Sequence, residues 1–326
     1  MASEGRMQPV APPVDQGATR LRYVCMPGSP YTGSTLLGFL LNTHPECASI
    51  GAAVGLTARV DLDSYLCSCG TPFRGCGFWN RVAARTVELG TPVPVFRGGD
   101  WPTHVRVSRR RWLNGLLIRS LGNTTLNAAR DAVVWRAGPV RRTLSEARAT
   151  TWGLARAVLE TTGKRVFVDT ARDHQRPKYL RQHPMLDVRV IHLVRDPRGT
   201  TASIMKHTGV DLARAARQWR HYNAEADRVK RLMPRGSWML LRYEELCADP
   251  QGTLDRIARF VDVQPAPAPP DLGTTEHHII GNSMRLRAIE GIREDRTWED
   301  RLDERDLRVI ARIVGRTSHR LGYDWP

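Results

Sequence analysis

The 326-residue sequence lacks any apolar run long enough to span a membrane, and no basic segment followed by an apolar stretch stands near its start. A membrane-spanning helix needs about 20 consecutive, mostly apolar residues. A secretory signal needs a positively charged beginning followed by a shorter apolar region. The sequence therefore predicts neither a membrane span nor a signal peptide, and we expect a cytoplasmic protein.

Cysteine is also scarce, with six in the whole chain. Thiols stay reduced in the cytoplasm, so a disulfide framework is not expected. Cys67, Cys69 and Cys76 stand close together and could offer three thiolates to zinc, with Cys47 as a candidate fourth ligand. A closed zinc site normally has four ligands, usually supplied as well-spaced pairs. Reduced, partly buried thiols are the favoured interpretation, and no metal is predicted.

Acidic residues are few relative to basic ones: 33 Asp and Glu stand against 49 Lys and Arg, a net charge of +16. Such a balance favours anionic partners, which include nucleotides, nucleic acids, membrane surfaces and acidic substrates. Residues 105–121 mix Arg with Trp and Leu, as a membrane-surface or nucleic-acid contact would. A solvated basic face is the simpler interpretation of this segment. If the segment has a function, we expect it to be a cap helix that binds or orients an acceptor.

The chain divides by composition into a tail and one domain. Residues 1–19 are rich in Pro, Gly, Gln and Ala and poor in large apolar groups, which predicts a flexible tail. Residues 20–326 show no internal repeat and are predicted to form a single domain. Within it, residues 57–160 break the regular pattern with turns, a cysteine cluster and basic helical segments. We expect them to form a partly helical cap.

Short apolar, β-branched stretches alternate with helical patterns in the rest of the domain. Such alternation predicts an α/β fold with a central parallel sheet flanked by helices. Ligands of these sheets bind at the carboxyl ends of the strands. The predicted strands are residues 21–26, 166–170, 187–194 and 238–243.

The loop after the first predicted strand has the spacing of a phosphate-binding loop. Gly28 and Gly33 bracket four residues between a strand and a helix, where backbone amides and the helix dipole favour an anion. The fold class is thus a P-loop-like nucleotide-binding core. Ser34 occupies the position of the Walker lysine, which disfavours an ordinary ATPase or kinase. Asp169 at a strand end could still hold Mg²⁺, so a nucleoside or small-molecule kinase remains an alternative.

Four motifs in order resemble the sulfotransferase family, in its bacterial type. PYTGSTLL followed by HPE is similar to the family's 5′-phosphosulfate loop and its helix, and HLVRDPRGTTASIMKH to its 3′-phosphate motif. RYEEL at 242–246 and HHIIGNSMR at 277–285 match further landmarks. The resemblance extends from about residue 21 to residue 326 and has least support between 80 and 160.

This resemblance implies transfer of a sulfuryl group from 3′-phosphoadenosine 5′-phosphosulfate to a hydroxyl of a small-molecule acceptor whose identity the sequence does not state. The product would be 3′,5′-ADP, and no metal would be needed. The implied nucleotide-binding residues are Tyr31, Thr32, Gly33, Ser34 and Thr35 at the 5′-phosphosulfate, Arg195 and Ser203 at the 3′-phosphate, Tyr243 near adenine, and Asn282, Ser283 and Arg285 closing over the nucleotide.

The chain departs from the family at the leaving phosphate. The family usually has Arg or Lys just before the Ser/Thr-Gly of its loop, whereas this chain has Tyr31. A phenol donates one hydrogen bond but brings no charge. Arg172 resembles the Lys of the family's strand-end Asp-Ser-Ser-Lys motif and is the predicted catalytic cation, with Lys206 and Arg285 in reserve.

A second departure concerns the general base. Several branches of the family have a catalytic Glu in a Gly-Glu pair, at the place where this chain has Gly51-Ala52. Alanine has no proton chemistry, so the enzyme is either impaired or uses another base. Asp169 ranks first as the substitute because a strand end is where such sheets bind ligands. His174, His44 and His104 are the further candidates.

The alternative from another functional class is a non-catalytic protein that binds nucleic acid or another polyanion and retains a phosphate loop without activity. The net charge of +16, Tyr31 and Ala52 favour it. Several nucleotide motifs in family order oppose it, and we predict no nucleic-acid partner. The amphipathic segments 107–121 and 304–321 could serve a homodimer interface.

Overall fold

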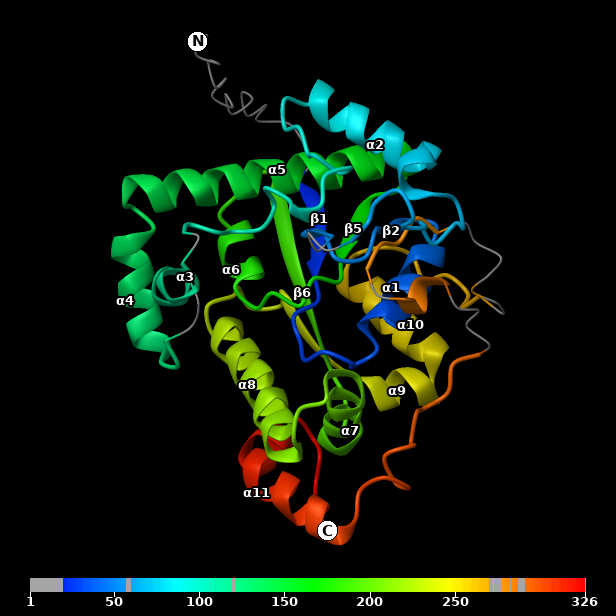
Figure 1. Ribbon diagram of the computed structural model, residues 1–326. Helices are drawn as coiled ribbons and strands as arrows, with labels where there is room; N and C mark the ends of the chain where they lie inside the picture. Colours follow the sequence, from blue (N-terminus) through cyan, green and yellow to red (C-terminus); the bar gives the residue numbers. More distant parts are fainter. Residues whose placement is uncertain are drawn as a thin grey trace.

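The computed structural model describes residues 20–56, 60–108, 110–118, 121–269, 272, 277–281, 283–286 and 291–325. The predicted tail, residues 1–19, lies outside this range. Five parallel strands form the central sheet in the order β2-β5-β1-β6-β7, which confirms the predicted α/β fold (Figure 1). The strands are β1 (Leu21–Cys25), β2 (Cys47–Ser49), β5 (Val166–Asp169), β6 (Leu186–Val194) and β7 (Trp238–Arg242). A separate antiparallel pair consists of β3 (Gly55–Leu56) and β4 (Gly99–Asp100).

Both faces of the sheet are covered by helices. Successive side chains of a strand point to opposite faces, so Tyr23 and Phe167 join one apolar cluster while Val24 and Val168 join another. The first cluster includes side chains of α5 and α2, and the second includes side chains of α1, α9 and α10. Burial on both faces explains why these strands are mostly apolar in the sequence.

A third apolar cluster joins helices α7, α8 and α11, which lie together at one end of the sheet in Figure 1. The bounds are α1 (Ser34–Thr43), α2 (Gly77–Glu88), α3 (Arg111–Leu117), α4 (Thr124–Val134), α5 (Gly138–Thr162), α6 (Arg176–Leu180), α7 (Pro197–Thr208), α8 (Leu212–Lys230), α9 (Tyr243–Ala248), α10 (Pro250–Phe260) and α11 (Glu304–Arg320), with 3₁₀ turns at Phe73–Gly75 and Ser283–Leu286.

Helix α5 belongs to the core rather than to a cap. Its buried residues include Leu154, Ala155 and Val158, and it packs against β1, β2 and β5. The C-terminal part of the predicted cap at 57–160, which lies in α5, therefore packs against the sheet. None of the helices in the described ranges is long and apolar enough to cross a bilayer.

The two amphipathic segments proposed for a dimer interface differ in the structure. Ile310 and Val314 of α11 are fully buried against α7 and α8, so the apolar face of 304–321 is already used within the chain. In α3, by contrast, Trp112 and Leu116 remain 64% and 52% exposed. Only the segment 107–121 keeps an open apolar face that an interface could use.

Candidate functional site

A cavity of about 1440 Å³ opens at the carboxyl ends of the strands. The loops after β1, β5, β6 and β7 contribute to its wall, as do α7, α8 and the segment 104–106. This is the edge at which parallel sheets bind ligands. The predicted site residues that line it are Tyr31, Gly33, Ser34, Thr35, Arg172, Arg195, Ser203 and Tyr243. Asn282 lies outside the described residues, and for Ser283 only the backbone, in a 3₁₀ turn, is described.

The phosphate loop turns sharply into α1. Gly33 is the N-cap of this helix with φ 87°, and a Cβ there would lie 2.7 Å from Cδ2 of Tyr243, so no larger residue fits. Ser34 and Thr35 stand in the first turn of α1, the end of the helix at which the helix dipole favours an anion. Thr32 points the other way: it is 2% exposed, and its hydroxyl donates to the Ser29 carbonyl over 3.1 Å. The hydroxyl of Thr32 therefore does not face the cavity, contrary to the prediction.

Arg195 follows β6 and connects the phosphate loop to Asp295. Its Nη1 donates to the Tyr31 carbonyl oxygen over 3.2 Å, and its Nη2 donates to the carbonyl and carboxylate oxygens of Asp295 over 2.6 and 3.1 Å. The guanidinium lies 4.8 Å from the centre of the Tyr243 ring. Asp196, the next residue in the chain, forms an ion pair with Arg198 and not with Arg195. Arg195 is thus held at the cavity with its charge beside the loop.

Tyr243 begins α9 and packs against the turn of the phosphate loop. Its hydroxyl donates to the Arg293 carbonyl over 3.1 Å and accepts from the Asp295 amide over 3.3 Å. Burial raises the pKa of this phenol above its ordinary value, which keeps the group neutral. The ring offers a flat, uncharged wall beside Arg195.

Asp169 does not reach the cavity, which corrects the prediction that it is the general base. Its side chain is almost fully buried, and its two oxygens accept from Nε of Arg176 over 2.5 Å, from the Tyr23 hydroxyl over 2.6 Å, and from the amides of Ala53 and Ala171 over 2.9 Å each. Both oxygens are occupied by these donors, so neither faces a substrate.

Arg285 does not lie where the prediction of a nucleotide contact requires it. It donates to the Leu66 carbonyl over 3.1 and 2.9 Å and to the Gly281 carbonyl over 3.0 Å, and it covers the ring of Tyr65 at 3.9 Å. It is absent from the cavity wall, as is Lys206, which is exposed on α7. Of the three predicted cations Arg172, Lys206 and Arg285, Arg172 lines the cavity. It forms no ion pair within the described ranges.

Two of the three candidate histidines line the cavity. His44 is bonded to the Gln264 carbonyl and the Glu46 amide, away from it. His104 and His174 both belong to the cavity wall. Burial, with repulsion from His192 and His221, lowers the pKa of His174 to about 3, which makes it a weak base. His104 is left as the best-placed base among the predicted residues.

Sequence reasoning missed a polar face of α8. Gln218, His221, Tyr222 and Glu225 all line the cavity, and their spacing of three, four and seven residues puts them on one side of the helix. His207 was missed as well; its ring stacks on Tyr31 with centroids 4.8 Å apart. The helical spacing of polar side chains on α8 was the available signal.

We expect acid to destabilise the fold through the buried histidines. Burial lowers the pKa of His174 to about 3 and of His192 to about 4. Above about pH 6.5 both histidines are neutral in the folded and in the unfolded chain, so they do not lower the free energy of unfolding. Below that pH they are protonated in the unfolded chain but not in the folded chain, which lowers the free energy of unfolding by about 2 kcal/mol per histidine at pH 5. These two histidines should therefore make the free energy of unfolding about 4 kcal/mol lower at pH 5 than at pH 7.5, as measured with urea, and the partly buried His183, whose pKa is lowered to about 4, should add to the difference.

Two variants test the assignment. His174→Phe should remove about half of the part of this difference that His174 and His192 contribute, whereas His319→Gln, at a position whose side chain is 81% exposed, should leave the difference unchanged. An equal loss of stability in wild type and His174→Phe would contradict the role given to His174.

Residues 146–267 match the sulfotransferase family. This range holds β5 to α10 and therefore includes Arg172, Arg195, Ser203 and Tyr243, while the phosphate loop precedes it. The resemblance to this family inferred from the motifs is confirmed. A search of the curated proteins finds no match.

Three solved structures are similar to this chain at low identity. The sulfotransferase domain from the curacin biosynthetic pathway is 14% identical, with 95% of this chain and 99% of that one covered and a TM-score of 0.47. The sulfotransferase domain of the Synechococcus olefin synthase is 17% identical, with 95% and 98% covered and a TM-score of 0.46. Retinol dehydratase in complex with retinol and PAP is 14% identical, with 95% and 84% covered and a TM-score of 0.44.

Proposed function

We propose that this protein transfers a sulfuryl group from 3′-phosphoadenosine 5′-phosphosulfate to a hydroxyl group of a small molecule without a metal ion. The observation that supports this most is that one cavity is lined both by a phosphate loop with Ser34 in place of the Walker lysine and by Arg195 and Ser203 from the next strand-helix unit. Two separate anion-binding elements suit a nucleotide with phosphates at both its 5′ and 3′ ends.

The size of the cavity supports two ligands at once. At about 1440 Å³ it exceeds the roughly 300–1,000 Å³ of a typical small-molecule pocket. We assign the end with the phosphate loop and Arg195 to the donor. The acceptor would occupy the end formed by the polar face of α8 and the segment 104–106. Beside that end, Nε2 of His174 and Oε2 of Glu225 are buried without a hydrogen-bond partner in the described part of the chain, which suits a polar acceptor or bound water.

The proposed step is an in-line displacement at sulfur. The acceptor oxygen forms a bond to sulfur, the bond from sulfur to the 5′-phosphate oxygen breaks, and the hydroxyl proton leaves to a base. The products are a sulfate ester and 3′,5′-ADP. Arg172 would neutralise the charge that develops on the leaving phosphate. We propose His104 as the base because it lines the cavity while Asp169 does not.

Titration calorimetry with 3′,5′-ADP tests the donor site. We expect binding that does not depend on added Mg²⁺ and that becomes about 100-fold weaker in Arg195→Ala, since two charge-assisted hydrogen bonds would be lost. Arg189→Ala is the matched control: Arg189 also comes from β6, but it bonds Asp187 and Asp262 outside the cavity.

Three outcomes would contradict the proposal. Absence of 3′,5′-ADP binding by a folded protein would remove the donor site. Mg²⁺-dependent turnover of ATP would favour a kinase. Binding of DNA with a steep salt dependence and no nucleotide binding would favour the polyanion-binding alternative.

A further inference from the structure

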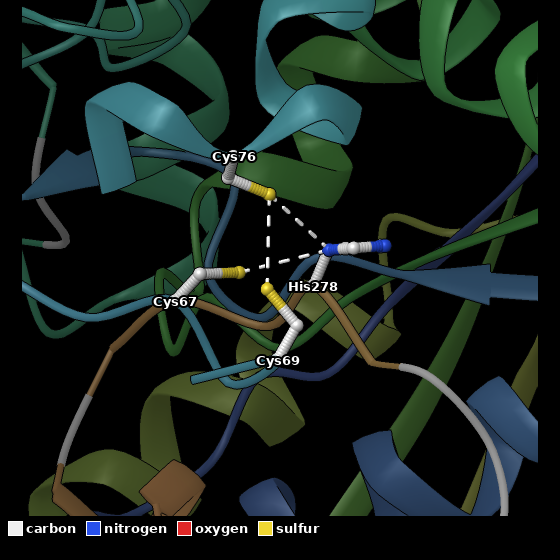
Figure 2. A group of neighbouring side chains, drawn as sticks. All are labelled: Cys67, Cys69, Cys76 and His278. Carbon is white, nitrogen blue, oxygen red and sulfur yellow. Dashed lines mark hydrogen bonds between the residues drawn. The ribbon is translucent and has the colours of Figure 1, made fainter. Parts of the chain in front are cut away.

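Three cysteines and one histidine converge outside the nucleotide cavity. Cys67, Cys69 and Cys76 come from the turns before α2, and His278 comes from a segment about 200 residues later (Figure 2). One ligand atom from each, three Sγ and Nδ1 of His278, lies within 4.8 Å of all the others. Cys47, the fourth ligand considered from the sequence, lies in β2 and is not part of this group.

The spacing of the four atoms is that of a tetrahedral metal site. Bonds of about 2.3 Å from zinc to sulfur and about 2.0–2.1 Å to nitrogen place two sulfurs about 3.8 Å apart and sulfur and nitrogen about 3.5 Å apart. Cys69 Sγ lies 3.8 Å from Cys76 Sγ, and Nδ1 of His278 lies 3.7 Å from Cys67 Sγ and 3.4 Å from Cys76 Sγ. Figure 2 shows the four side chains pointing toward a common centre.

The four side chains are enclosed and the imidazole is fixed in place. Cys67 and Cys76 are buried, and Cys69 and His278 are partly buried. The ring of His278 is stacked on Phe78, with centroids 4.3 Å apart and planes 4° from parallel. The stacking holds the ring in the orientation that turns Nδ1 to the sulfurs.

We propose that Cys67, Cys69, Cys76 and His278 bind one zinc ion in a closed structural site. Three soft thiolates and an imidazole in a tetrahedral arrangement are a donor set that selects zinc over oxygen-preferring cations. All four positions are filled by side chains, so no position is left for water or substrate. The ion would be structural and would take no part in sulfuryl transfer.

The site would connect the turns before α2 to the distant segment 279–281, which lines the cavity. The Ser68 hydroxyl donates to the His277 carbonyl and accepts from the Ile279 amide, each over 2.7 Å. The Ile280 amide donates to the Ile50 carbonyl over 2.9 Å, and 279–281 line the cavity. Zinc at His278 would therefore fix the cavity wall at 279–281 to the turns that precede α2.

Metal analysis of the full-length, untagged protein, exchanged into metal-free buffer with a reductant, tests the site. We expect one zinc per chain in wild type and a near-complete loss in Cys76→Ala and in His278→Ala. Cys47→Ala is the matched control because it removes another buried thiol from outside the cluster, and it should keep its zinc. Equal zinc in Cys76→Ala and Cys47→Ala would overturn the proposal.

A second measurement needs no variant. Wild type refolded with Co²⁺ should show thiolate-to-cobalt charge-transfer bands and the visible bands of a tetrahedral ion, and zinc should displace them. A metal-free wild type that gives no such bands, or one isolated with a disulfide between Cys69 and Cys76, would also overturn the proposal. Neither measurement involves nucleotide, so the result is independent of the proposed sulfuryl transfer.

Discussion

Asp169→Ala is expected to lower the free energy of unfolding by about 3–5 kcal/mol, because it leaves the Arg176 charge buried without its partner. Both side chains are essentially inaccessible to solvent. The loss reaches beyond the pair, since Asp169 also accepts the amides of Ala53 and Ala171 and so anchors two turns at the cavity. Urea unfolding of wild type and variant at one pH measures the difference.

A double-mutant cycle separates this structural role from a catalytic one. Asp169→Ala combined with Arg176→Met should be destabilised by less than the sum of the single variants, by about 1–3 kcal/mol, because the unpaired charge is then removed. Wild-type stability in Asp169→Ala together with abolished turnover would instead return Asp169 to the role of base.

The sequence was sufficient for the elements whose signals are local. A mostly apolar, β-branched stretch predicts β6, and the spacing of Gly28 and Gly33 between strand and helix predicts the phosphate loop. Arg195 follows from its position directly after that strand. In each case the neighbours in the chain determine the conformation, so a window of some ten residues contains the information. β2 was missed because three residues are too few for a pattern.

The contacts of long side chains join residues far apart in the sequence, so they could not be predicted in the same way. Arg285 looked like a nucleotide ligand from its motif, yet its guanidinium bonds the Leu66 carbonyl, 219 residues away. His278 belongs to the same problem: three cysteines were visible as a cluster, but nothing in the sequence singles out one of ten histidines as the fourth member. Such contacts depend on how loops pack after the sheet has formed.

The turn at Ala52 is the place where a missing base could be restored. Ala52 lines the cavity, and its neighbours are fixed on both sides: the Ala53 amide donates to Asp169, and the Gly51 carbonyl accepts from the Thr170 amide over 3.0 Å. A carboxylate on this rigid turn would be held at the cavity that also contains Arg172. It would occupy the position at which the motif resemblance leads us to expect a catalytic Glu.

Under the proposed function, Ala52→Glu should raise turnover by up to about 10²-fold over the rate that depends on His104, because the carboxylate would be a second base fixed at the cavity. The assay is release of 3′,5′-ADP from 3′-phosphoadenosine 5′-phosphosulfate, with octanol as a probe acceptor. Ala52→Gln is the matched control, because it adds the same volume and hydrogen-bonding reach without proton chemistry. The Glu variant should lose its advantage as the pH falls below the pKa of the new carboxyl, while the Gln variant should stay near wild type. Equal rates in the two variants would mean that the turn at 52 does not present its side chain to the reacting hydroxyl, and that His104 alone serves as the base.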